Sequence, residues 1–237
     1  MTTLASSRLR QLARSSAAQT EAALERCELC GEPIAPEHRH LLDLDSRELM
    51  CSCRACSILF DRRAAGGSHY RLVPDRRLRL DGFDLDDASW AELRIPVEMA
   101  FFFRLGREDR MVALYPSPAG PTESLLELDS WQDLELRNPV LRTLEPDVEA
   151  LLVNRARGAR EHYLVPIEDP FRLVALIRTS WRGLTGGKEV WQQIEGFFAE
   201  LSSRSKTIDN SGEGTSWEAS GPASPTSTRA SSDTSRA

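Results

Sequence analysis

All five cysteines of this 237-residue chain lie between positions 27 and 56. Four of them form two Cys-x-x-Cys pairs, Cys27 with Cys30 and Cys53 with Cys56. Each such turn directs two sulfurs at one ion while backbone N–H groups stabilise their negative charge, and two turns together give a tetrahedral four-thiolate site. We therefore predict that these four cysteines bind one metal ion.

Zinc is the ion expected at a closed four-thiolate site, and iron is the alternative. Rubredoxins, which hold iron, resemble this chain in having two Cys-x-x-Cys pairs, each followed by glycine. Here Gly31 follows the first pair but Ser57 follows the second, which favours zinc.

Three further residues between the two pairs, His38, His40 and Cys51, also have metal-binding side chains. We expect Cys51 to be a small buried apolar residue, and a role as a substitute ligand is the alternative. The segment His38-Arg-His40 is similar to the start of a ββα-metal nuclease motif, but it lacks the later helical ligands. We therefore expect both histidines at the rim of the module, bonded to a backbone carbonyl or a cysteine sulfur.

Short strands and turns are expected to hold these cysteines in a zinc-ribbon-like module over residues 26–80. Residues 40–45 and 48–52 predict two strands that meet at Ser46-Arg47. The apolar residues 58–60 predict a third strand, and residues 70–74 predict another extended piece.

Residues 81–205 predict a separate α+β body. Apolar strands are expected at 99–105 and 111–115, and the continuous apolar run within the first indicates burial on both faces. Proline, capping and spacing signals predict helices that begin near Pro146, Asp169 and Lys188.

The two flanking segments differ in composition from the rest. Residues 1–25 are expected to form a flexible or helical N-terminal segment, the lead-in to the ribbon module. Residues 206–237 contain eight Ser and five Thr, so we expect a disordered tail, because such a segment buries too little apolar surface to offset its chain entropy. The predicted fold class is therefore α+β, with the ribbon module first.

Net charge and hydropathy restrict where in the cell the protein is expected to lie and what it is expected to bind. The formal net charge is −6, and no apolar run approaches the roughly 18 residues that span a bilayer. The N-terminus lacks the apolar centre of a secretory signal. We expect a cytoplasmic protein with no membrane span, where clustered cysteines bind metal rather than form disulfides.

Seven arginines between residues 54 and 80 make nucleic-acid binding a further hypothesis. The acidic remainder and the general preference for Arg over Lys argue against it. The sequence also contains no P-loop, dinucleotide fingerprint or nucleophile elbow. We therefore expect no enzymatic activity.

Several motifs resemble those of an uncharacterised bacterial family that is encoded beside uptake nickel–iron hydrogenases. The resemblance covers about residues 26–203 and rests on Cys27-Glu-Leu-Cys30-Gly, His38-Arg-His40-Leu-Leu-Asp, Cys51-x-Cys53-Arg-Ala-Cys56, Tyr70-Arg-Leu-Val-Pro74 and the Pro116-Ser-Pro-Ala-Gly loop. It implies a protein partner, with hydrogenase subunits or maturation factors as candidates, and it assigns no catalytic residue. The resulting hypothesis is a non-enzymatic metal-binding accessory protein. A rubredoxin-like electron carrier and a nucleic-acid-binding ribbon are the alternatives.

Overall fold

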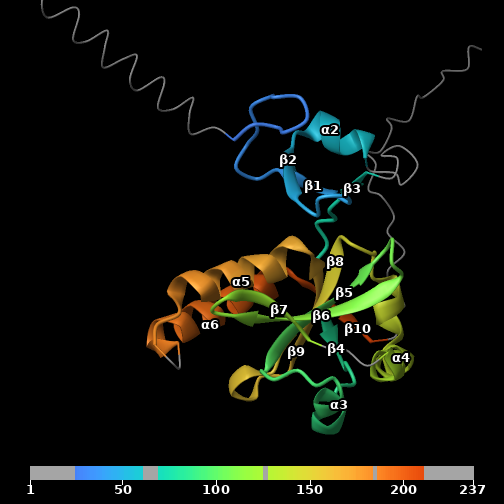
Figure 1. Ribbon diagram of the computed structural model, residues 1–237, viewed down its shortest axis with the longest axis vertical. Helices are drawn as coiled ribbons and strands as arrows, with labels where there is room; N and C mark the ends of the chain where they lie inside the picture. Colours follow the sequence, from blue (N-terminus) through green and yellow to red (C-terminus); the bar gives the residue numbers. More distant parts are fainter. Residues whose placement is uncertain (1–24, 61–68, 125–127, 184–185, 211–237) are drawn as a thin grey trace, which may run out of the picture.

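The computed structural model describes residues 25–60, 69–124, 128–183 and 186–210. Its fold is mixed α+β, as the sequence predicts. A small N-terminal module (residues 25–73, the ribbon module) contains a three-stranded sheet, and a larger body contains a seven-stranded sheet. The ribbon module lies at one end of the body, against the ends of its strands (Figure 1).

The ribbon module is built around an antiparallel sheet of order β2-β1-β3. Its strands are β1 (Arg39–Asp43), β2 (Leu49–Ser52) and β3 (Tyr70–Leu72). The predicted hairpin is confirmed, and Asp43 closes it by accepting hydrogen bonds from the backbone N–H groups of Asp45 and Ser46.

The strand predicted at residues 58–60 is wrong, because this segment belongs to helix α2 (Arg54–Leu59). The Cys53 sulfur accepts a hydrogen bond from the Cys56 N–H at 3.4 Å and caps the helix. A side-chain acceptor at this position favours a helical start over an extended chain. Ile58 and Leu59 of α2 are left exposed.

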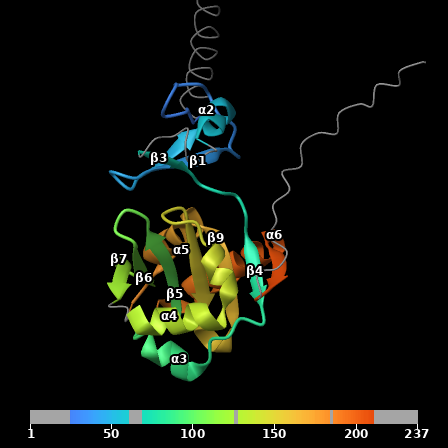
Figure 2. The same ribbon diagram turned by 90° about the vertical axis from the view of Figure 1, so that its right-hand side faces the viewer.

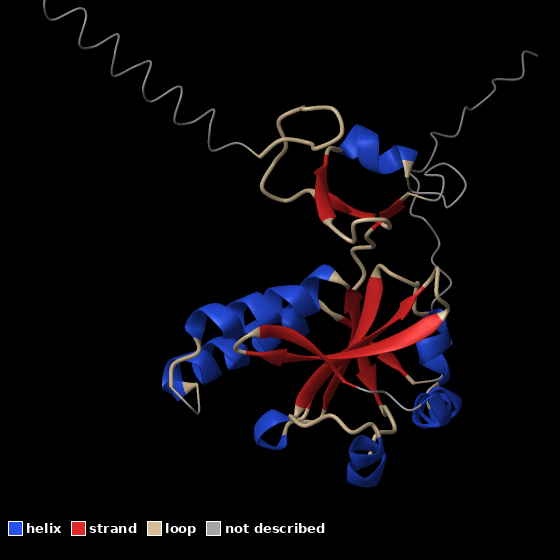
Figure 3. Cartoon of the chain, viewed as in Figure 1, coloured by secondary structure: helices blue, strands red, loops and turns tan. Residues whose placement is uncertain are grey.

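The body sheet has the order β10-β4-β9-β8-β5-β6-β7, in which only β10 and β4 pair in parallel. Strands lie at the centre of the body with helices around them (Figure 3). The strand bounds are β4 (Leu78–Asp81), β5 (Met99–Leu105), β6 (Arg110–Ser117), β7 (Gly120–Ser124), β8 (Glu149–Asn154), β9 (Glu161–Pro166) and β10 (Lys206–Asp209).

Helices cover both faces of this sheet, so alternate residues of a strand enter different cores. Phe101 and Phe103 pack with α5 (Glu168–Ser180) and α6 (Gly187–Arg204). Phe102 packs on the opposite face, where Trp131 of α4 (Leu128–Arg137) lies against it. The prediction that this strand is buried on both faces is confirmed. The described ranges also contain α3 (Asp87–Glu92) and the short 3-10 turns Pro139–Thr143 and Ala156–Gly158.

The helix predicted from Pro146 is wrong, because residues 149–154 form the central strand β8. Their apolar residues have helical spacing, but a strand buried on both faces gives the same continuous run. Asp147 has a positive φ of 68° and forms a tight turn before the strand. Its carboxylate accepts a hydrogen bond from the Gly106 N–H at 2.8 Å, which fixes the turn against the neighbouring hairpin.

Two strands, β4 and β10, cross the boundaries that the sequence predicts for the ribbon module and for the C-terminal tail. β4 pairs with β9 in the body sheet, so the module limit expected at residue 80 falls inside a body strand. β10 lies within the segment predicted to be disordered, yet residues 206–209 pair with β4 along their length. The backbone N–H of Lys206 also donates to the carbonyl oxygen of Arg77 at 2.9 Å. The other residues of the predicted lead-in and tail, 1–24 and 211–237, lie outside the described ranges.

A short apolar cluster and the connecting chain join the two modules. Leu42 and Val73 of the ribbon module pack against Val148 of the body, and all three are buried. Figure 2 shows the chain running from β3 along the side of the body into β4. Within the described ranges, no helix combines the length and apolar character needed to cross a membrane.

Candidate metal centre

The first pair of the four-cysteine site, Cys27 and Cys30, lies on a tight loop between residues 26 and 33. The Gly31 N–H donates to the Cys27 carbonyl at 2.8 Å, and Gly31 has a positive φ of 77°. This left-handed conformation is one that glycine adopts without strain. The second pair, Cys53 and Cys56, lies at the start of α2.

The structure brings the four sulfurs of this site together. All four Sγ atoms lie within 4.8 Å of one another, and the Sγ atoms of Cys30 and Cys53 are 3.7 Å apart. A tetrahedral zinc site with Zn–S bonds of about 2.3 Å places its sulfurs about 3.8 Å apart. The sulfurs are therefore spaced as a four-thiolate ion requires, and no disulfide joins them.

Burial and hydrogen bonding act in opposite directions on these thiols. Burial opposes charge on Cys27, but hydrogen bonds from three backbone N–H groups, led by that of Cys53, lower the pKa of its thiol to about 6. Burial raises the pKa of the Cys56 thiol to about 12. Without a cation the Cys56 thiol would therefore stay protonated at neutral pH, whereas a coordinated metal deprotonates its thiols.

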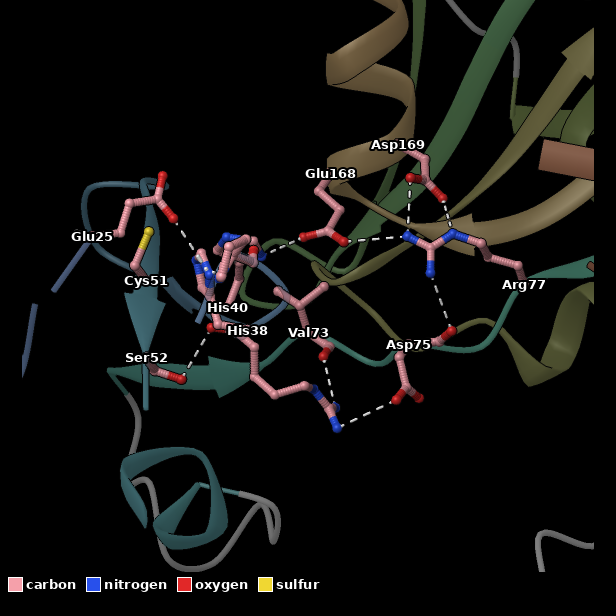
Figure 4. Close-up of polar contacts among 12 residues, drawn as sticks. Glu25, His38, His40, Cys51, Ser52, Val73, Asp75, Arg77, Glu168 and Asp169 are labelled. Carbon is pink, nitrogen blue, oxygen red and sulfur yellow. Dashed lines mark hydrogen bonds and ion pairs between the residues drawn. The ribbon is translucent and has the colours of Figure 1, made fainter. Parts of the chain in front are cut away.

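A second group of metal-binding side chains, the His-His-Cys cluster, consists of His38, His40 and Cys51. One ligand atom from each lies within 4.8 Å of the other two. The two imidazole rings meet edge to face with centroids 4.7 Å apart, and Figure 4 shows them beside Cys51. Cys51 is partly buried, and this burial raises its pKa.

The histidines are held by different partners. His38 Nδ1 lies 2.9 Å from the carbonyl oxygen of Ala35, as expected for a histidine bonded to the backbone. His40 Nδ1 lies 2.7 Å from Oε2 of Glu168, a residue of α5 in the body (Figure 4). The sequence could not indicate this contact, because the two residues are far apart in the chain. The hydrogen bond that His40 donates to the Glu168 carboxylate raises the pKa of His40.

A cleft of about 1000 Å³ separates this side of the ribbon module from the body. His38 and His40 line it from the ribbon module, and Glu168, Arg172 and Arg204 line it from α5 and α6. The two histidines of the His-His-Cys cluster therefore border the cleft, at the junction of the two modules.

Three of the seven arginines that suggested nucleic-acid binding bind carboxylates of the same chain. Arg71 donates to Asp147 at 2.8 Å. Arg76 donates to the fully buried Glu149, and Arg77 donates to Asp169, each through two nitrogens. Two further members, Arg62 and Arg63, lie outside the described ranges. Internal ion pairing makes Arg71, Arg76 and Arg77 poor candidates for phosphate contacts.

Comparisons with known proteins place the chain in one family. No curated protein and no solved structure matches it significantly. Residues 26–205 match a family of unknown function (DUF5947), a range that includes both cysteine pairs, the His-His-Cys cluster and nearly all of the described body. The chain therefore belongs to the DUF5947 family.

Proposed function

We propose that this protein is a non-enzymatic accessory protein whose four-cysteine site holds one zinc ion. The observation that carries the proposal is the gathering of four thiol sulfurs within 4.8 Å. Four protein ligands complete a tetrahedral shell and leave no position for a substrate, which is the pattern of a structural site. The ion would fix the first cysteine loop to the start of α2, which the described chain otherwise joins through few apolar side chains.

The proposed partner is another protein, with subunits or maturation factors of a nickel–iron hydrogenase as candidates. The support is the resemblance to a family encoded beside such enzymes. The exposed Ile58 and Leu59 of α2 offer a small apolar contact surface beside the metal site. Co-purification of tagged protein with hydrogenase subunits tests this assignment, with the Ile58→Asp variant as the matched control that should lose the partner but keep the metal.

Metal analysis of purified protein tests the four-thiolate site. We expect tightly bound zinc that Cys30→Ser removes together with the folded ribbon module, because metal binding supplies much of the folding free energy of such modules. Cys51→Ser is the matched control, and it should retain the ion in the four-cysteine site. Metal-free protein with an intact ribbon module would overturn the proposal.

Iron in the same sulfurs is the alternative, and it would make the ribbon module an electron carrier. The sulfur spacing suits it, because tetrahedral thiolate sites accept iron as well as zinc. Protein from iron-replete cells would then be red and would bleach on reduction. A colourless zinc protein from such cells would rule the alternative out.

A further inference from the structure

The His-His-Cys cluster contains a buried nitrogen without a hydrogen-bond partner. The His38 side chain is only 8% exposed. Its Nε2 atom is buried and has no hydrogen-bond partner. A buried polar atom without a partner is destabilising, so its position beside two other metal-binding side chains makes this nitrogen a candidate metal ligand.

The hydrogen bonds of both histidines leave the same ring nitrogen, Nε2, free to bind a metal ion. At His38, Nδ1 faces the carbonyl oxygens of Ala35 and Pro36 at 2.9 and 3.1 Å. Carbonyl oxygens accept only, so Nδ1 carries the proton and Nε2 carries the lone pair. At His40, Nδ1 faces the Glu168 carboxylate and is likewise the protonated nitrogen.

The contact between His40 and Glu168 is the arrangement found around metal-bound histidines. A histidine ligand usually donates its other N–H to a carboxylate or a carbonyl oxygen, which fixes the tautomer and makes the metal-facing nitrogen more basic. Here His40 Nδ1 has the Glu168 carboxylate. His38 Nδ1 has backbone carbonyls and also the Glu25 carboxylate, whose Oε2 is 3.4 Å away. Cys51 adds a sulfur that is close to both rings.

We infer that His38 Nε2, His40 Nε2 and Cys51 Sγ form a second metal site, separate from the four-cysteine site. Two imidazoles and one thiolate suit a divalent transition-metal ion such as Zn²⁺ or Co²⁺. Three protein ligands leave one coordination position open. Both histidines line the cleft, so the open position would lie beside it.

Metal content of full-length protein, with Zn²⁺ as the probe, tests the second site. Wild-type protein is expected to bind one Zn²⁺ more per chain than Cys51→Ala or His38→Ala. His69→Ala is the matched control, because His69 is exposed and pairs with Asp45 outside the cluster, and it should bind as the wild type does. Equal zinc content in the wild type and in both cluster variants would overturn the inference.

Glu168→Gln tests the positioning of His40 without removing a ligand. It should weaken Zn²⁺ binding at the second site by about tenfold, since second-shell partners typically contribute 10–100-fold to metal affinity. Glu200→Gln is the control, because Glu200 binds Arg172 and Arg204 at the same cleft without contacting the cluster.

X-ray absorption of the zinc-loaded wild type keeps the test independent of how the variants fold. Imidazole scattering together with sulfur scattering is expected at the zinc edge. Sulfur scattering alone would reject the second site and leave the four-thiolate proposal standing. A nitrogen-rich spectrum that is the same in Cys30→Ser would reject the four-thiolate proposal and leave the second site standing.

Discussion

At the scale of single residues, His162 shows how burial and nearby positive charges control ionisation. It lies on β9 with 5% of its surface exposed, stacked on Phe83 with ring centroids 4.6 Å apart. Burial, reinforced by the positive charges of Arg155 and Arg160, lowers the pKa of His162 to about 4. We interpret this histidine as a neutral core residue rather than a ligand.

This shift predicts acid sensitivity of the body. Between pH 6.5 and about 4 the unfolded chain binds a proton at His162 that the folded chain does not, so the free energy of unfolding falls as the pH falls through this window. The loss is on the order of 3 kcal/mol. In chemical denaturation at several pH values, His162→Leu should have a shallower pH dependence than the wild type.

The Phe83→Leu variant separates titration from packing in this experiment. It loosens the ring stack but keeps the histidine. We expect it to lower stability by a similar amount at every pH in the window. If His162→Leu kept the full wild-type slope, another group would be responsible for the acid sensitivity.

At the scale of elements, β10 shows why composition misplaced the start of the tail. Lys206, Thr207 and Asp209 are polar, but their backbone groups pair in parallel with β4. Ile208 packs against the core formed with α3 and α4. Asn210 then donates to the carbonyl oxygen of Arg137 at 3.1 Å. Backbone pairing and one apolar side chain therefore order a segment that looks unstructured by composition.

Two truncations test this placement of the last strand. A chain that ends at Asn210 should melt as the full-length protein does. A chain that ends at Ser205 lacks β10 and exposes the edge of β4, so it should lose about 2 kcal/mol, which lowers the melting temperature by about 4–8 °C. Equal melting temperatures for the two truncations in calorimetry would show that β10 does not stabilise the body.

At the scale of the whole molecule, the two modules are stabilised by different interactions. The body has two apolar cores, one on each face of its sheet. The ribbon module has a small cluster of Cys27, Ile34 and Cys56 around the four-cysteine site. Since so few apolar side chains meet there, we expect the ribbon module to depend on its ion while the body does not.

Metal removal should therefore separate the two modules. After treatment with a strong chelator, hydrogen exchange should become fast in β1 and β2 and stay slow in β5, β8 and β9. Chelator-treated Cys30→Ser protein is the control, and it should show no further change. Loss of protection across the body sheet would mean that the modules unfold as one cooperative unit.

Local sequence patterns were sufficient to predict the features that depend only on residues close together in the chain. Two Cys-x-x-Cys pairs predicted the four-cysteine site, and the structure places its sulfurs together. The strands at residues 99–105 and 111–115 and the helix near Lys188 were also predicted, because their apolar periodicity reflects the surfaces they bury. These features depend on spacing along the chain, which the sequence records directly.

Only the tertiary structure decided the features that depend on distant partners. β8 is a strand because β5 and β9 pair with it on either side, although its own residues also fit a helix. Internal carboxylates pair with Arg71, Arg76 and Arg77, which composition alone could not indicate. Glu168 meets His40 because α5 packs at the end of the body that faces the ribbon module. Such contacts depend on folding geometry, which no local pattern contains.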